Sequence, residues 1–585
     1  MDAYRDPSPA VPSSDEENDS SSNSDDHSDE DVLLTYDPPY ITIPEAFEVA
    51  YKASAHDDAP KSYAEAMTRP DAQLHHQAAC DEIQTLIDNG TWECVELPPG
   101  RKAIGCHWVF VIKHKSDGSV ECYKARLVAK GFSQCPGFDF NETYASTVRW
   151  ATLRAILAFA ALEDLEIESI DISSAFLNGE IDADVYMEQP EGFPQGDKGK
   201  VLRLLKSIYG LRQSPRLWHK KLDEVLCNQL GFRKIKSDAS VWVYDLDGVR
   251  IIVPVFVDDM TLVSKSKEQV DQLKQDLRKF FKLRDLGPTE FLLGVKIERD
   301  RSHRRLQLSQ RQYTLDVLKH YGFDTCSPVS TPMLPGTRLS HDQCPTKPED
   351  VEAMRSVPYA HAVGSLMYLA ISTRPDIAHS VGVLARFSSN PGQTHWAAVK
   401  HLFRYLQGTL DYKLTYEPNP SSSSLFTTFS DADHGGCKDT GRSTGAYVVK
   451  MGTGAVSWSS KLQPIVALST TEAEYVAAVS AGAELLWFRN LFTEFGFNLS
   501  STSSPLFIDN QSALAVAKNP EHHGRMKHLD LRFYWLRDEV EKGIISVSYC
   551  PTEHMPADIL TKSLSRDKVL TGCKLLGLQS SSVEF

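Results

Sequence analysis

The sequence contains no paired cysteine motif, no long apolar run and no apolar leader, and each absence narrows the class of protein. Its 11 cysteines are scattered through 585 residues without a CxxC pair, so we expect reduced thiols rather than a disulfide framework or a zinc cluster. Apolar runs such as Ile251–Val257 fall short of the roughly 20 residues that a membrane-spanning helix needs. No basic start or apolar stretch marks a secretory signal, so we expect an intracellular protein without a membrane partner.

Acidic charge is concentrated at one end of the chain. Of the formal net charge of −16, residues 1–31 carry eleven acids and one arginine, a net of −10, which leaves −6 for the rest. These residues offer little to bury and are expected to form a disordered tail; a polyanionic arm that binds a partner is the alternative. Elsewhere, residues 198–236 hold eleven Lys or Arg against two acids, and residues 101–130 hold seven against two. This segregation, rather than the total, decides which surfaces attract a polyanion.

Two strand ends carry the first group of candidate catalytic acids. Asp258 and Asp259 lie at a tight turn between two strongly apolar strands, and Asp171 lies at the end of another strand 87 residues earlier. Crowded carboxylates are unfavourable unless a cation or proton neutralises them. An acid pair at a turn also fits an ordinary hairpin, but three acids on two strand ends can bridge two divalent metals. This arrangement favours phosphoryl transfer, in which the metals activate a hydroxyl and neutralise a leaving pyrophosphate.

Five motifs carry a family resemblance that runs from about residue 60 to residue 562. The chain resembles the reverse transcriptases of copia-type LTR retrotransposons. The matching segments, which occur in the order expected for that family, are Tyr123–Phe132, Asp171–Gly179, Ser207–Trp218, Phe256–Met260 and Ser372–Ile377.

The resemblance implies roles for individual residues. Asp171, Asp258 and Asp259 would be the metal-binding triad of the polymerase palm. Phe176 would be a steric gate that excludes a 2′-hydroxyl, with a plain core residue as the alternative. Gln213 would lie beside the template and the nucleotide, with a helix cap as the alternative. One or two of four basic residues on the first hairpin would contact the triphosphate, and a solvated basic face explains the others: Lys113, Lys115, Lys124 and Arg126.

Two residues depart from the family pattern. Phe256 occupies a position where many reverse transcriptases have tyrosine, which removes one hydroxyl contact. Pro254 lacks a backbone donor, so we expect its strand to be an edge strand or to be bulged there.

A second group of acids follows the order strand, helix, strand, helix and resembles ribonuclease H. In that fold Asp431, Glu474, Asp509 and Asp558 would converge on two magnesium ions and direct water at the RNA strand of a hybrid. Asp433 and Glu472 are the alternative assignments. Taken singly, Glu472 or Glu474 also fits a helix cap, and Asp558 fits an acid favoured at a helix start.

The expected fold class is mixed α/β and multidomain, with right-hand polymerase fingers, palm and thumb followed by a ribonuclease H-like mixed-sheet domain. The expected boundaries are an acidic tail (1–35), a helical extension (36–98), the reverse transcriptase (99–325), a connection (326–420), the ribonuclease H-like domain (421–565) and a C-terminal tail (566–585). We find no zinc knuckle, convincing protease or integrase segment, so we expect a piece of a longer polyprotein.

The resemblance implies an RNA-directed DNA polymerase with ribonuclease H activity, each site using two Mg²⁺, with Mn²⁺ as the alternative cation. Its partners would be an RNA template, a DNA primer, deoxynucleoside triphosphates and an RNA–DNA hybrid; the oligomeric state stays open. We expect the protein in the cytoplasm or a virus-like particle, with nuclear access left open. The rival hypotheses are a catalytically silent relic that at most binds nucleic acid, and a chain in which only the ribonuclease H module works.

Overall fold

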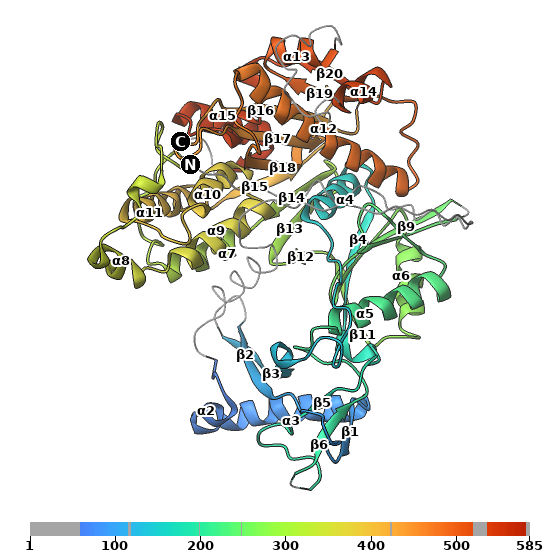
Figure 1. Cartoon of the computed structure of the whole chain (residues 1–585). Helices are drawn as coiled ribbons and strands as arrows, with labels where there is room; N and C mark the ends of the chain where they lie inside the picture. The colour runs from blue at the N-terminus through green and yellow to red at the C-terminus, as the bar shows by residue number, and fades with distance from the viewer. Residues whose placement is uncertain are drawn as a thin grey trace, which may run out of the picture. The chain divides into compact units, whose positions relative to one another are not determined.

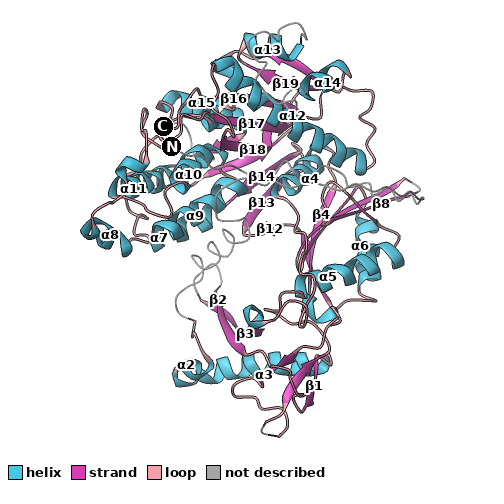
Figure 2. Cartoon of the chain, in the orientation of Figure 1, coloured by secondary structure: helices cyan, strands magenta, loops and turns pink. Residues whose placement is uncertain are grey.

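The computed structural model describes residues 59–114, 119–197, 199–246, 248–421, 424–518 and 535–580. Helices and strands both run throughout this part of the chain, which confirms the expected mixed α/β class (Figures 1 and 2). The predicted acidic tail lies outside the described residues. Among the helices that the structure describes, none is long and apolar enough to cross a membrane.

The first described part is a small core built on a helix and two sheets. His75, Ala79, Ile83 and Leu86 recur at helical spacing on α3, and this buried face packs against β3. The expected helical extension therefore shares a core with the first hairpin. The elements are α2 (Tyr63–Thr68), α3 (Ala72–Asp88), the pair β2 (Cys106–His114) and β3 (Val120–Ala129), the short helix η2 (Gly131–Ser133), and the sheet β1–β6–β5 of β1 (Trp92–Val95), β6 (Val201–Leu204) and β5 (Tyr186–Met187).

A six-stranded antiparallel sheet in the order β11–β4–β10–β9–β8–β7 carries the first acids. Alternate residues face opposite sides: Leu262 joins the core formed with α5 and α6, whereas Val263 joins the core that contains α4. The strands are β4 (Glu166–Ile172), β7 (Arg233–Lys234), β8 (Val241–Leu246), β9 (Val249–Phe256), β10 (Asp259–Ser264) and β11 (Leu283–Pro288). The helices are α4 (Trp150–Leu162), η3 (Ala175–Asn178), α5 (Ser214–Asp223), its π-helical continuation η4 (Glu224–Gln229) and α6 (Lys267–Leu277).

The expectation for Pro254 is wrong. Strand β9 is central, between β8 and β10, and Pro254 lies opposite Val241 in regular register. The β9–β10 pairing resumes on either side of Val253 and Pro254 without a register shift. The missing donor is therefore accommodated by a gap in one ladder, and neither an edge nor a bulge is needed.

The middle of the chain and its C-terminal end build one further antiparallel sheet, β12–β13–β14–β15–β21. The structure corrects the expectation of a C-terminal tail over residues 566–585. Residues Arg566–Leu576 form α15, and Leu578–Ser580 form β21, which pairs with β15. The strands are β12 (Phe291–Leu292), β13 (Val295–Asp300), β14 (Arg305–Ser309) and β15 (Tyr412–Tyr416). The helices are α7 (Arg311–His320), η5 (His341–Gln343), α8 (Pro348–Arg355), α9 (Tyr359–Ser372), η6 (Pro375–Ile377), α10 (Ala378–Ala385) and α11 (Gln393–Gly408).

The second group of acids lies on a mixed sheet in the order β18–β17–β16–β19–β20, in which β16, β19 and β20 are parallel. The long helix α12 packs against β16, β17 and β19 (Figure 1). The strands are β16 (Thr427–Ala432), β17 (Thr444–Met451), β18 (Gly454–Leu462), β19 (Ser504–Ile508) and β20 (Ile545–Tyr549). The helices are α12 (Thr470–Glu494), α13 (Gln511–Lys518), α14 (Trp535–Glu541), η9 (Thr552–His554) and η10 (Asp558–Leu560).

The expected domain boundaries at residues 326 and 421 do not separate cores. One cluster of buried side chains includes members from Val148 to Leu578. Arg154 of α4 is buried, donates to the carbonyls of Val456 (2.8 Å) and Ser372 (3.0 Å), and stacks 3.8 Å from the ring centre of Trp458. A buried guanidinium needs such acceptors, so this arginine ties three expected domains to one another.

Candidate active sites

The strand pairing of the first sheet brings the three predicted palm acids to neighbouring backbone positions, although their carboxylate oxygens do not form one of the groups of described residues that lie within 4.8 Å of one another. Asp171 at the end of β4 lies directly opposite Asp259 at the start of β10, and the backbone amide of Ile172 donates to the carbonyl of Asp258 (3.0 Å). Val257, which precedes the two acids, has φ = +57°, an unfavourable value for a β-branched residue. Its carbonyl accepts a hydrogen bond from the indole of Trp218 (2.7 Å). The acid-bearing turn is thus strained and held in place from outside.

Burial and mutual repulsion act on these acids. Burial, then Asp258 and Asp171, raise the pKa of Asp259 to about 6. Burial also raises the pKa of Asp258, as does Asp171, while Arg126 and Lys124 oppose the rise. A cation placed among the three carboxylates would remove this repulsion. All three donors are carboxylate oxygens, which suits a hard divalent cation.

A cavity of about 170 Å³ adjoins the acids. Lys124 and Arg126, two residues apart on β3, line it together with Asp171 and Asp258. Its other lining residues are Glu82, Leu86, Leu127, Ile172, Ser173, Ser174, Leu177, Ile208 and Tyr209. The cavity therefore has carboxylates on one strand pair and cations on another, which suits a phosphate-bearing ligand with a metal. The side chain of Lys113, and the whole of Lys115, lie outside the described residues.

Phe176 is buried beside this cavity and does not line it. Its ring meets the Tyr209 ring edge-on at 4.7 Å, and Tyr209 faces the cavity with the Arg126 guanidinium 4.5 Å above its centre. Burial raises the pKa of Tyr209 to about 12, so the hydroxyl stays neutral. Phe176 thus supports the wall that Tyr209 forms. Sequence reasoning missed both Tyr209 and Glu82; the tyrosine lies inside the Ser207–Trp218 motif, which was the available signal.

Gln213 is fully buried at the start of α5, but its side chain does not cap that helix. Its amide nitrogen donates to the carbonyl of Asp139 (2.9 Å), and its oxygen accepts from the side chain of Gln134 (3.0 Å). The helix-cap alternative is therefore wrong. Gln213 fixes the segment that follows β3, and its predicted contact with template and nucleotide stays a prediction.

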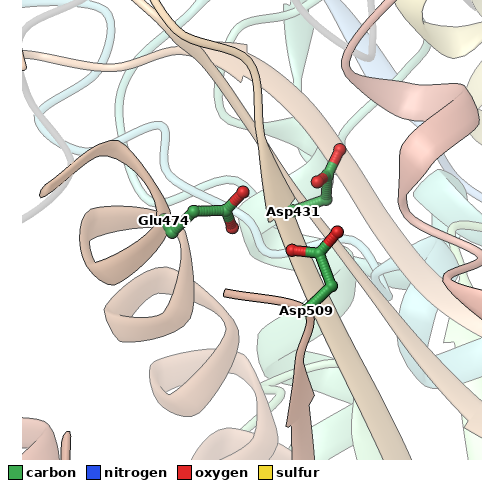
Figure 3. Close-up of side chains that lie close together, drawn as sticks. All are labelled: Asp431, Glu474 and Asp509. Carbon is green, nitrogen blue, oxygen red and sulfur yellow. The ribbon is translucent and has the colours of Figure 1, made fainter. Parts of the chain in front are cut away.

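Three acids of the second group converge from three elements. Asp431 lies on β16, Asp509 follows the parallel neighbour β19, and Glu474 lies in the first turns of α12 (Figure 3). One carboxylate oxygen from each lies within 4.8 Å of the other two. Parallel strands end at the same edge of a sheet, which explains why Asp431 and Asp509 meet.

The alternative acids hold backbone amides instead. Glu472 accepts from the amide of Leu468 (2.9 Å), which precedes the N-cap residue Ser469, and its own amide donates to the Ser469 hydroxyl. Asp433 accepts from the amide of Thr444, and its pKa is raised, chiefly by burial. Both acids thus have backbone partners nearby, whereas Asp431 and Asp509 accept from the hydroxyls of Thr561 and Thr552 and share one cluster with Glu474.

The converging acids are costly to ionise together. Burial, then Asp431 and Asp509, raise the pKa of Glu474 to about 9. Burial likewise raises the pKa of Asp431 to about 6, with Lys562 opposing the rise. Glu474 Oε2 is buried and has no hydrogen-bond partner among the described residues. An oxygen-only donor set with an unpaired buried oxygen fits a hard divalent cation.

Asp558 lies at the edge of this group, and a lysine holds it. The ammonium of Lys562 contacts Asp558 Oδ1 and lies 4.0 Å from Asp431 Oδ2. The hydroxyl of Thr561 also donates to Asp431. Sequence reasoning missed Lys562, although it follows Asp558 by four residues, a spacing that can bring acid and base together.

Comparisons with known proteins identify a family that includes the part of the chain with the first site. Residues 89–335 match the family model described as reverse transcriptase (RNA-dependent DNA polymerase). The chain is 42% identical over 91% of its length to a retrovirus-related Pol polyprotein from transposon TNT 1-94 of Nicotiana tabacum, and 38% identical over 84% to one from transposon RE2 of Arabidopsis thaliana. It spans 40% and 33% of these relatives. It is also 30% identical, over 54% of its length, to a putative transposon Ty5-1 protein of Saccharomyces cerevisiae, which it covers completely.

Proposed function

The chain belongs to the copia-type retrotransposon Pol polyproteins with reverse transcriptase, and from this premise we propose that it is an RNA-directed DNA polymerase. It extends a DNA primer on an RNA template from deoxynucleoside triphosphates. The observation that carries the proposal is the register of β4 against β10, which sets Asp171 opposite Asp259 with Asp258 adjacent.

The residues around the first cavity divide the work of nucleotide transfer. Asp171, Asp258 and Asp259 would hold two Mg²⁺, which, when bound, supply an acidified primer hydroxyl and neutralise charge on the leaving pyrophosphate. Lys124 and Arg126 bind the triphosphate across the same cavity. Tyr209, supported by Phe176, shapes the wall against which the sugar lies.

A second activity, hydrolysis of the RNA strand of an RNA–DNA hybrid, is supported by the second acid group. Three oxygens, one each from Asp431, Glu474 and Asp509, lie within 4.8 Å of one another. Lys562 bridges Asp558 to Asp431. These acids would hold Mg²⁺, which would supply an activated water. RNA is distinguished from DNA there by its 2′-hydroxyls.

Separate inactivation of the two sites tests both proposals. Asp258→Asn is expected to lower primer extension on an RNA template by more than about 100-fold, since even groups that only support a metal ligand contribute 10–100-fold. The same variant should keep cleavage of a preformed hybrid. Asp509→Asn should show the opposite pattern. Each variant is the matched folding control for the other, because each retains the other's activity.

The rival hypotheses give different results in the same assay. A silent relic shows neither extension nor cleavage, with or without Mg²⁺ or Mn²⁺, although the protein is folded. A chain with only the second module cleaves the hybrid and never extends a primer. Loss of both activities in either single variant would contradict the assignment of two independent sites.

A further inference from the structure

The lysine Lys562 lies among the four carboxylates of the second site. The ammonium of Lys562 contacts Asp558 Oδ1 and is 4.0 Å from Asp431 Oδ2, on the side of Asp431 that also accepts from Thr561. Glu474 and Asp509 complete the group from α12 and from the end of β19. The lysine thus occupies the space between the fourth acid and the first.

The position of Lys562 explains why Asp558 stays outside the three-way cluster. Oxygens of Asp431, Glu474 and Asp509 lie within 4.8 Å of one another, and Asp558 is not among them. Asp558 is 6% exposed, so its carboxylate needs a partner, and the lysine is the cation in contact with it. A divalent cation shared by Asp431 and Asp558 would compete with this ammonium for the same oxygens.

We propose that Lys562 is a resident counterion of this site: it neutralises Asp558 and Asp431 in the metal-free protein and leaves them when a divalent cation binds. The proposal rests on the proposed metal-binding role of these acids. The Lys562 side chain is 42% exposed, so the ammonium can move into solvent without crossing the core. Lys562 is therefore a positioning residue that sets how readily the site takes up metal.

Metal binding without nucleic acid tests the proposal directly. The protein is the full chain carrying Asp258→Asn and Asp259→Asn, which removes two of the three carboxylates of the other site. It is titrated with MnCl₂, and free Mn²⁺ is measured by electron paramagnetic resonance. In this background Lys562→Met is expected to lower the Mn²⁺ dissociation constant of the site roughly three- to tenfold. The effect is moderate because solvent partly screens the half-exposed ammonium that competes with Mn²⁺ for the carboxylates.

Matched variants separate competition from a general loss of charge or fold. Lys568→Met removes the same charge from an exposed position on α15 and should leave the dissociation constant unchanged. Lys562→Arg keeps the charge and should stay within twofold of the parent protein. Lys562→Gln repeats the test should the methionine variant not fold. Asp431→Asn should abolish the binding, which assigns the measured Mn²⁺ to this cluster.

Equal or weaker Mn²⁺ binding in Lys562→Met and Lys562→Gln than in Lys568→Met would overturn the proposal, as would binding that survives Asp431→Asn. Hybrid cleavage without any effect of Lys562 on Mn²⁺ affinity refutes the counterion role alone. The expected affinity change in a protein that never cleaves a hybrid refutes the proposed activity alone.

Discussion

Replacing Glu474 by glutamine is expected to stabilise the metal-free protein at alkaline pH while it abolishes hybrid cleavage. Burial, followed by Asp431 and Asp509, raises the pKa of Glu474 to about 9 from an ordinary value of 4.5. Between these two values the folded chain holds a proton that the unfolded chain has released. The stability of the metal-free protein therefore falls as the pH rises through this window.

The size of the effect follows from the width of the window. Each pH unit between the two pKa values is equivalent to about 1.4 kcal/mol. Counted from the ordinary pKa of 4.5, the raised pKa of Glu474 lowers the free energy of unfolding by at most about 5 kcal/mol at pH 8. At pH 5 the loss is less than about 1 kcal/mol. Asp431 shares part of the same charge repulsion, so the full bound is not reached. We therefore expect the free energy of unfolding of metal-free Glu474→Gln to exceed that of the wild type by about 2–5 kcal/mol at pH 8.

Thermal denaturation in EDTA from pH 5 to pH 8 measures the difference. The melting temperature of Glu474→Gln should rise above that of the wild type by an increment that grows with pH. In saturating Mg²⁺ the increment should shrink or reverse, because only the wild type keeps all its ligands. Glu472→Gln, two residues away on α12, is the matched variant and should retain hybrid cleavage. An increment that is constant across the pH range would refute the reasoning.

Two further predictions concern the cavity wall and the C-terminal strand. Phe176→Ala should raise ribonucleotide incorporation relative to deoxynucleotide incorporation by about 10- to 200-fold, because Tyr209 loses its support. Phe176→Tyr keeps the ring and should discriminate between the two sugars as the wild type does. Unchanged sugar selectivity in the alanine variant would show that Phe176 has no gate role. Ending the chain after Gly577 should cost about 1.5–3 kcal/mol from the lost burial of Leu578 alone, measured by chemical denaturation. A chain ending after Ser580 keeps β21 and is the control; equal stability of the two truncated chains would contradict the argument.

The candidate catalytic acids could be predicted because short-range patterns define them. Asp258 and Asp509 follow apolar strands, Asp171 lies near the end of β4, and the family motifs fix which acids to compare. The resemblance favoured Glu474 over Glu472, but the sequence supplied no physical reason for this choice, since both lie in the first turns of the same helix. It depends on which carboxylate turns toward the sheet and which bonds the Leu468 amide.

Features that depend on distant partners were missed or misjudged. Pro254 was expected to mark an edge strand or a bulge because the sequence does not reveal that a central strand can skip two ladder positions. Residues 566–580 were expected to be a tail because β21 is three residues long and gains its stability from β15, more than 160 residues earlier. The roles of Lys562 and Tyr209 depend on contacts with residues that are distant in sequence, Asp431 for the lysine and Arg126 for the tyrosine.

The buried Arg154 has a consequence for dissecting the molecule. Its guanidinium is surrounded by carbonyls contributed by residues far downstream, so cutting the backbone near residue 421 would not yield two self-sufficient pieces. The upstream piece would keep the Ser372 acceptor of Arg154 but lose the Val456 carbonyl, and the downstream piece would expose Trp458. A nicked chain should instead remain a non-covalent pair, and the unit to express for testing either proposed activity is the chain from α2 to β21.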